Sequence, residues 1–279
     1  MGKVLAAESR IPCIEEARVV SAERESAAGR LQQLVGLLSK PMPDWRDFSV
    51  ELNEALLVTF VNPYSVRVMM DCPEYFEALS AFDVVFPDGE LLASSAARQL
   101  GRSVPRQSFD GNSLAPQVLS FCREHRLRVA LIGGMTGVAE TAASLFREVF
   151  DVDVVMVRSG FFESSTQLRD CYQCVDEKQI DVVICGMGAP RQDQFLLGLK
   201  ASGWKGLGFT CGGYLDQASV SGVTYYPDWI NRLNLRAPYR LLREPRRLWR
   251  RYLVDYQHFF FADAQIRWKA IKNPPGNGS

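Results

Sequence analysis

The sequence predicts an α/β protein with a doubly wound, mainly parallel, Rossmann-like sheet and a C-terminal basic amphipathic helical appendage. Three features support this fold class. Short runs rich in Val, Ile and Leu, without polar alternation, recur along the chain, as expected for strands buried on both faces. Helix-length amphipathic segments separate these runs. The excess positive charge gathers near the C-terminus.

The composition narrows the class of protein. The 279 residues are 47% hydrophobic and 23% charged, which excludes a mainly disordered chain. The formal net charge is zero, so we expect no nucleic-acid partner. Residues 226–272 nevertheless hold nine Arg and two Lys against four acidic residues, a net charge of +7.

The chain divides into four predicted parts. Residues 1–50 form an N-terminal extension or a loosely packed helix, 51–225 an α/β domain, 226–272 the basic appendage and 273–279 a disordered tail. The α/β domain contains all six predicted strands, so we expect it to fold without the appendage. These strands lie at residues 55–61, 82–86, 128–132, 152–157, 180–185 and 206–210.

The residues that follow the strands predict a nucleotide pocket, because ligands bind beyond the carboxyl ends of such strands. Three glycine-rich turns open onto helices at 133–137, 186–190 and 211–213. Backbone N–H groups in such turns can approach a phosphate. A simple tight turn is the alternative for each of them taken singly.

Asp88 is the carboxylate that the sequence singles out. It follows the strand at 82–86 and precedes Gly89, so it faces the predicted pocket. A carboxylate there can act as a general base. It can equally be the N-cap of the helix that begins near Glu90.

No metal, cofactor or membrane-spanning segment is predicted. The seven cysteines are scattered, and only two histidines accompany them, which does not supply a zinc site. No apolar run reaches the roughly 18–20 residues of a transmembrane helix. We therefore expect a cytoplasmic protein.

Four segments together carry a resemblance to a known family. At Pro87-Asp88-Gly89, 131–134, 186–193 and the Arg-rich tail, the chain resembles the WecG/TagA/CpsF glycosyltransferases over about residues 55–256. The resemblance implies an inverting, metal-independent transfer from a UDP-sugar to a polyprenyl-diphosphate-linked sugar at the inner face of the cytoplasmic membrane. It also implies that the α/β domain binds the nucleotide sugar.

The resemblance assigns site residues. Residues 188–193 read Gly-Ala-Pro-Arg-Gln-Asp where the family reads G-x-P-K-Q-E, and the family's catalytic aspartate falls on Asp88. Its T-x-N falls on residues 60–62, with the threonine displaced to Thr59. The substrate-binding residues expected are Asn62, Arg106, Asp110, Gly133, Gly134, Gly188, Gln192 and Asp216.

Two departures from the family pattern bear on the donor sugar. The R-x-x-G-x-D stretch appears as residues 106–111 with the glycine and aspartate displaced, and the R-A-P segment appears as Tyr225-Tyr226-Pro227. These changes favour the exopolysaccharide branch of the family, which adds glucose in xanthan-type assembly.

The Arg-rich tail predicts contact with an anionic membrane surface and with the acceptor diphosphate. An apolar stripe between Leu248 and Phe260 is flanked by arginines, as in an interfacial helix. A helix packed on the core with a solvated charged face is the alternative. The arginines expected to bind are Arg236, Arg240, Arg243, Arg246, Arg247, Arg250 and Arg251.

Two other functions stay open at this point. A nicotinamide-dependent oxidoreductase shares the fold class but needs a full G-x-G-x-x-G turn, whereas this chain has only Gly133-Gly134-x-x-Gly137. A non-catalytic membrane-docking protein would not need Asp88. Whether the chain forms a homo-oligomer is also left open.

Overall fold

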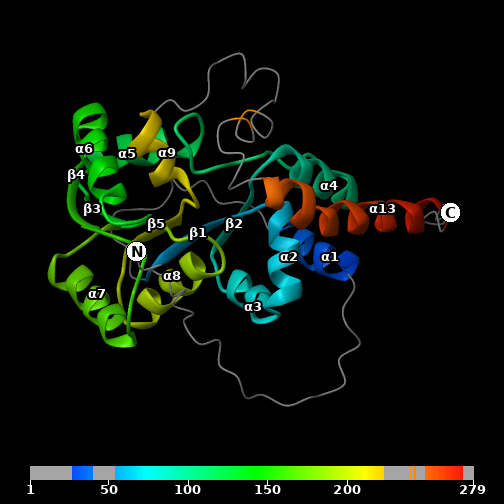
Figure 1. The fold of residues 1–279 in the computed structure, drawn as a ribbon, viewed down its shortest axis with the longest axis horizontal. Helices are drawn as coiled ribbons and strands as arrows, with labels where there is room; N and C mark the ends of the chain where they lie inside the picture. The colour runs from blue at the N-terminus through cyan, green and yellow to red at the C-terminus, as the bar shows by residue number, and fades with distance from the viewer. Residues whose placement is uncertain (1–26, 40–53, 223–238, 240–241, 243–248, 273–279) are drawn as a thin grey trace, which may run out of the picture.

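The computed structural model describes residues 27–39, 54–222, 239, 242 and 249–272 (Figure 1). Six strands form one sheet in the order β2-β1-β6-β5-β3-β4, and every neighbouring pair is parallel. The predicted fold class is confirmed. The expected disordered tail and the boundary between residues 225 and 226 lie outside the described residues, so the four-part division stays a prediction.

All six apolar runs form strands, with bounds shifted by one or two residues. The strands are β1 (Leu56–Val61), β2 (Val84–Pro87), β3 (Arg128–Gly133), β4 (Asp153–Arg158), β5 (Val182–Gly186) and β6 (Leu207–Thr210).

Helices cover both faces of the sheet, which explains the absence of polar alternation along the strands. In β3, Ala130 and Ile132 face one hydrophobic cluster, whereas Val129 and Leu131 face the other. The first cluster is built with α2 (Pro63–Asp71), α3 (Glu74–Ser80), α4 (Glu90–Leu100), α7 (Ser165–Glu177) and α8 (Arg191–Ala201). The second is built with α5 (Leu114–Glu124), α6 (Val138–Phe150) and α9 (Tyr214–Ser221).

The first and last described helices pack against each other. Helix α1 (Ala27–Leu37) contacts α13 (Gln257–Lys272), and both contact α2 (Figure 1). Leu31 and Leu34 of α1 are fully buried, and Phe259 of α13 joins the same cluster. The loose packing expected for the N-terminal helix is therefore wrong, because its leucines recur at helical spacing and cover one apolar face.

Polar contacts also hold α13 on α4. The Asp263 carboxylate accepts a hydrogen bond from Ser95 Oγ at 2.5 Å and pairs with Arg98 at 3.0 Å. Burial acts to raise the pKa of Asp263, but the contacts with Ser95, Arg98 and Arg267 outweigh it, and this pKa lies below its usual value. Removing the chain from residue 226 onward would break these contacts and uncover Phe259, which argues against the separable core expected from the sequence.

A buried polar network joins the first turn of α8 to the centre of the sheet. Asp193 is fully buried, and its Oδ1 atom accepts a hydrogen bond from Thr59 Oγ1 at 2.6 Å. The Thr59 hydroxyl lies 2.9 Å from that of Thr210, so the network links β1, β6 and α8. Burial raises the pKa of Asp193 to about 7, although the hydrogen bond from Thr59 opposes the shift. The displaced threonine of the family pattern thus has a structural role.

We predict that Asp193→Asn changes the pH dependence of stability. The pKa rises from 3.8 in an unconstrained chain to about 7 in the folded protein, so the folded state retains a proton that the unfolded state has lost between those pH values. Stability should then fall as pH rises from about 4 through 7, by up to about 4 kcal/mol. The amide of the variant cannot ionise, so urea unfolding should show it more stable than the parent at pH 8 and similar at pH 4.

Asp170→Asn is the matched control, because Asp170 is an exposed carboxylate on α7. It should change the free energy of unfolding by the same small amount at both pH values. Parallel pH curves for the parent protein and Asp193→Asn would contradict the prediction.

Candidate active site

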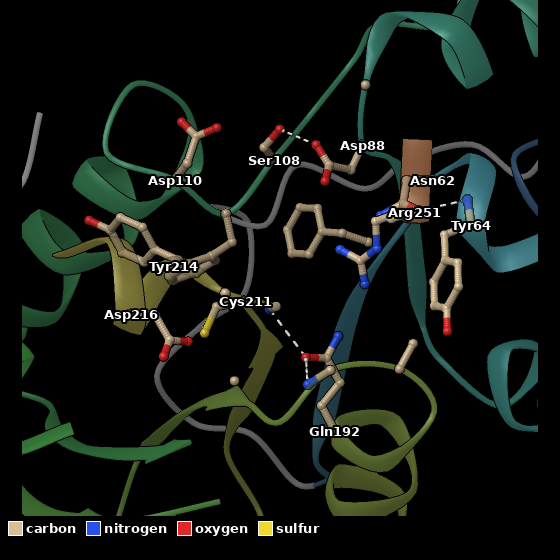
Figure 2. A pocket seen from close by; sticks show the side chains of 18 of the residues that line it. Asn62, Tyr64, Asp88, Ser108, Asp110, Gln192, Cys211, Tyr214, Asp216 and Arg251 are labelled. Atoms are coloured by element: carbon tan, nitrogen blue, oxygen red, sulfur yellow. Dashed lines mark hydrogen bonds between the residues drawn. The ribbon is translucent and has the colours of Figure 1, made fainter. Parts of the chain in front are cut away.

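A cavity of about 880 Å³ lies at the carboxyl edge of the sheet (Figure 2). Residues at the ends of five strands line it, together with the loop between α4 and α5 and a π-helical turn, η2 (Arg251–Asp255). The volume lies in the range of small-molecule sites. Of the site residues expected in the α/β domain, the cavity collects Asn62, Asp88, Arg106, Asp110, Gly134, Gly188, Gln192 and Asp216.

Asp88 is held at the end of β2 with its carboxylate on the cavity. Its N–H donates to Val61 O at 2.7 Å, and its Oδ1 atom accepts from Ser108 Oγ at 2.6 Å. Helix α4 begins after Gly89, which is its N-cap, and Asp88 does not cap it. The capping alternative is therefore wrong, and no described residue donates to the second carboxylate oxygen.

Asn62 has a structural role and also faces the cavity. Its Oδ1 atom accepts from Tyr64 N at 3.0 Å, and its own N–H donates to Ser65 Oγ at 3.1 Å, a capping box at the start of α2. The cap uses the amide oxygen, so the side-chain NH₂ group is left to donate to a ligand.

Arg106 and Asp110 restrain one another in the loop before α5. Their closest atoms are 3.4 Å apart, and Arg106 also donates to Ser108 Oγ at 2.6 Å. Asp110 Oδ1 accepts from Asn112 N at 2.9 Å. Both predicted ligand-binding side chains therefore shape the loop as well as the cavity.

The glycine-rich turn after β3 does not present its first N–H groups as expected. Gly133 lies outside the cavity, and a Cβ atom there would come within 2.4 Å of Gly186 O, so the glycine permits close contact of β3 and β5. The N–H of Gly134 donates to Gly186 O at 3.1 Å. These contacts argue against the phosphate-binding role expected for both glycines.

Gln192 ties two of the turns together at the base of the cavity (Figure 2). Its Oε1 atom accepts from Gly188 N at 3.2 Å and from Gly212 N at 3.1 Å. These bonds occupy two further N–H groups that could have met a phosphate. They also fix the Gln192 amide, whose NH₂ group is left to donate toward a ligand.

Three residues of α9 border the cavity beside the turn at 211–213, namely Tyr214, Asp216 and Gln217. Asp216 lies in the first turn of the helix, and its carboxylate has no hydrogen-bond partner among the described residues. Tyr214 packs against Phe109 and Phe146, and burial raises the pKa of its hydroxyl. The sequence singled out Asp216 but carried no signal for Tyr214.

The C-terminal segment reaches the cavity through η2. The Arg251 guanidinium lies 4.6 Å from the centre of the Tyr64 ring, and Tyr252 and Tyr256 complete this wall. Arg250 is exposed on the outside. The other predicted arginines, Arg236, Arg240, Arg243, Arg246 and Arg247, lie outside the described residues, as does the segment at 225–227.

The predicted apolar stripe divides into inward and outward residues. Tyr256 and Phe259 are buried, whereas Trp249, Leu253 and Phe260 are exposed. Exposed apolar side chains continue along α13 beyond the predicted stripe, at Phe261, Trp268 and Ile271. In the parts of the chain that the structure describes, no helix is long and apolar enough to cross a bilayer.

No three His, Cys, Asp or Glu side chains of the described residues lie together in an arrangement that could hold a metal ion. The cysteines that the structure describes are thiols and not disulfides. Burial raises the pKa of Cys122 to about 12. Cys211 borders the cavity, and burial likewise raises its pKa.

Comparison with known proteins places this cavity in a family context. The chain is 31% identical over 204 residues to a Shigella boydii protein named UDP-Gal:alpha-D-GlcNAc-diphosphoundecaprenol beta-1,4-galactosyltransferase, covering 73% of this chain and 83% of that protein. It is 24% identical over 198 residues to the N-acetylglucosaminyldiphosphoundecaprenol N-acetyl-beta-D-mannosaminyltransferase of Bacillus subtilis strain 168, covering 71% and 75%. The Bacillus spizizenii protein of the same name is 26% identical over 206 residues, covering 73% and 77%.

The model of one family matches residues 41–273, which include β1 to β6, the cavity and α13. That family is described as the glycosyl transferases of the WecG/TagA/CpsF family. The chain therefore belongs to the WecG/TagA/CpsF family of glycosyltransferases.

Proposed function

We propose that this glycosyltransferase moves a hexose from a UDP-sugar to a polyprenyl-diphosphate-linked sugar, with inversion and without a metal ion. The reaction would belong to bacterial cell-surface or exopolysaccharide synthesis and take place on the inner face of the cytoplasmic membrane. The observation that carries the proposal is Asp88, whose carboxylate faces an 880 Å³ cavity that Arg251 also borders. One wall thus offers a base and another a cation.

The proposed reaction is a single displacement. The Asp88 carboxylate takes the proton of the acceptor hydroxyl while that oxygen bonds to the anomeric carbon. The bond from this carbon to the UDP oxygen breaks on the opposite side, and its electron pair leaves with UDP. Arg251 is one of three described arginines on the cavity, with Arg106 and Arg191, and we assign it to stabilise the charge on the diphosphate, because a guanidinium can bind two phosphate oxygens.

Amide donors support binding of the donor substrate. The NH₂ groups of Gln192 and Asn62 are left to donate because their oxygens are used within the protein. The Asp216 carboxylate can accept from a ribose, sugar or base N–H or O–H group. The carboxylate and the two amides together suit a nucleotide sugar better than a simple anion.

The donor sugar is the least constrained part of the proposal. The changes at residues 106–111 favour glucose, whereas the name of the Shigella relative specifies UDP-Gal. Glucose and galactose are both hexoses. The names of the Bacillus relatives instead specify N-acetylmannosaminyl transfer. We infer a UDP-hexose and rank UDP-glucose and UDP-galactose as the first two donors to test.

The decisive experiment offers the full-length protein a polyprenyl-diphosphate-linked N-acetylglucosamine with a panel of UDP-sugars, with and without EDTA. Mass spectrometry of the lipid product identifies the sugar added, and NMR of the released glycan identifies the anomer. Transfer of one hexose, unaffected by EDTA, is the expected result. No transfer from any donor would overturn the proposal, and loss of transfer in EDTA would overturn its metal-free part.

The other two functions receive less support. The nicotinamide-dependent oxidoreductase lacks the glycine fingerprint, and the family to which the chain belongs is one of glycosyltransferases. The non-catalytic docking protein predicts that Asp88→Asn leaves the cellular phenotype intact, whereas the enzyme predicts that it does not.

We predict that Asp88→Asn lowers kcat by roughly 100-fold or more, the scale of a lost general base. The amide oxygen of the variant can still accept the hydrogen bond from Ser108, so the loop and UDP affinity should be preserved. Initial rates measure the first effect, and isothermal titration with UDP measures the second.

Glu77→Gln is the matched control for Asp88→Asn, because it removes an exposed carboxylate on α3, the helix before β2, outside the cavity. It should keep the parent rate. Near-parental turnover of Asp88→Asn would remove Asp88 as the base, and the general base would have to be sought at another residue.

We predict that Arg251→Gln weakens UDP binding by about 10-fold, the loss expected for hydrogen bonds to a charged group. Arg250→Gln should change UDP binding little, because Arg250 is exposed outside the cavity. Titration of both variants with UDP, without membranes, shows whether UDP affinity depends on the arginine in the cavity or on the total positive charge. Equal losses in the two variants would contradict the proposal for Arg251.

The outer face of α13 supports the proposed membrane contact. Phe261, Trp268 and Ile271 are 72%, 61% and 74% exposed, and their spacing places them on one side of the helix. Lys269 and Lys272 lie in the same last turns. Exposed aromatic residues bordered by cations suit an anionic bilayer interface.

We predict that Phe261→Ser combined with Trp268→Ser weakens binding to vesicles containing phosphatidylglycerol, because it removes two large apolar side chains from this face. Vesicle sedimentation at low and high salt measures the effect. Val220→Ser is the control, since Val220 is 84% exposed on α9, outside the C-terminal segment. Unchanged binding of the double variant, or no binding by the parent protein at low salt, would argue against this face.

A further inference from the structure

A directed chain of hydrogen bonds leads from Arg106 through Ser108 to Asp88. Figure 2 shows its second bond, between Ser108 and Asp88. Ser108 Oγ lies 2.6 Å from a terminal nitrogen of Arg106 and 2.6 Å from Asp88 Oδ1. A guanidinium has donors and no acceptor, so Ser108 must accept from Arg106. Its own hydroxyl proton is then directed to the Asp88 carboxylate.

The surrounding backbone fixes the position of Ser108. Its side chain is buried, and its carbonyl accepts from Leu114 N at 3.0 Å at the start of α5. The preceding residue, Gln107, donates its N–H to Pro87 O at 3.0 Å and so joins the loop to β2. The following residue, Phe109, packs its ring 5.5 Å from that of Phe209. Ser108 is thus held from both sides, next to the strand that carries Asp88.

An aspartate needs such a partner to present one particular oxygen. The torsion that turns a carboxylate about its own bond has a broad energy profile, so the side chain does not fix its orientation by itself. The backbone N–H of Asp88 donates to Val61 O and sets the main chain, not the carboxylate plane. The hydrogen bond from Ser108 engages Oδ1 and leaves Oδ2 for the cavity.

We propose that Ser108 is a positioning residue for the general base, orienting Asp88 so that Oδ2 meets the acceptor hydroxyl. Arg106 in turn orients Ser108. The inference rests on the proposed function of Asp88 as the base. Ser108 occupies the second variable position of the R-x-x-G-x-D stretch at residues 106–111, next to the displaced glycine.

The first test is Ser108→Ala in the full-length protein, assayed with the UDP-hexose that the donor panel identifies. Loss of a hydrogen bond to a charged group predicts that kcat falls roughly 10- to 100-fold. The KM for the donor and the Kd for UDP should stay within about two-fold of the parent values, because Ser108 acts through Asp88. Ser103→Ala is the matched control: it removes an exposed hydroxyl from the same loop, outside the cavity, and it should keep the parent kcat.

A double-mutant cycle distinguishes positioning from a general structural effect. In the Asp88→Asn background, Ser108→Ala should lower kcat no further, because the base through which Ser108 acts is gone. Ser108→Thr keeps a hydroxyl and should restore part of the rate if thermal melting shows that it folds like the parent. An equal loss from Ser108→Ala in both backgrounds would overturn the inference.

The outcomes also separate this inference from the proposed function. If Asp88→Asn abolishes turnover while Ser108→Ala keeps the parent kcat, Asp88 remains the base and the role of Ser108 is wrong. If Asp88→Asn keeps the parent kcat, the general base is wrong and the inference fails with it. A fall in kcat for Ser108→Ala with a matching rise in donor KM would point to a distorted cavity and would also overturn the inference.

Discussion

The parallel direction of all six strands is the constraint on which the rest of the structure depends. Parallel neighbours require a crossover between successive strands, and here each crossover contains helices that cover one face or the other. Every strand then ends at the same edge of the sheet. Residues from five strand ends, spread from Phe60 to Cys211, therefore line a single cavity although about 150 positions separate them.

The two faces of α8 show how closely the core and the cavity are joined. Gln192 bonds to two glycine-rich turns at the base of the cavity, while the next residue, Asp193, reaches into the sheet and accepts from Thr59. The first turn of α8 thus holds the base of the cavity in place and also carries a buried polar contact in the core. A change in either residue acts on both, because the same backbone carries them.

Much of the fold could be predicted from the sequence, because a strand buried on both faces is a short apolar run without polar alternation. The six strands, and the position of Asp88 at the end of one of them, follow from these apolar runs. What could not be predicted depends on contacts between distant residues. The packing of α1 required knowledge of α13, more than 200 residues away, and the bonds from Gly188 and Gly212 to Gln192 required the register of two strands.

The position of the site could also be predicted, because it lies at the carboxyl ends of the strands. The roles of several of its residues could not. The glycine at position 133 was interpreted as a phosphate contact, but its neighbour across the sheet leaves no space for a side chain. Gly89, not Asp88, is the N-cap of α4, so the Asp88 carboxylate does not cap the helix and faces the cavity instead. Ser108 had no signal at all, because a single serine in a loop has no periodicity and no characteristic spacing.

The contact between α1 and α13 has a consequence for how the protein is made. The ribosome synthesises α13 more than 200 residues after α1, so the part of the leucine face of α1 that packs on α13 has no partner until α13 has been made. The strands can pair sooner, because domains generally begin to fold from the N-terminus during synthesis. The wall that carries Arg251 is attached to α13 and closes the cavity only then. Nascent chains that end before α13 would hold an assembled sheet but an incomplete cavity.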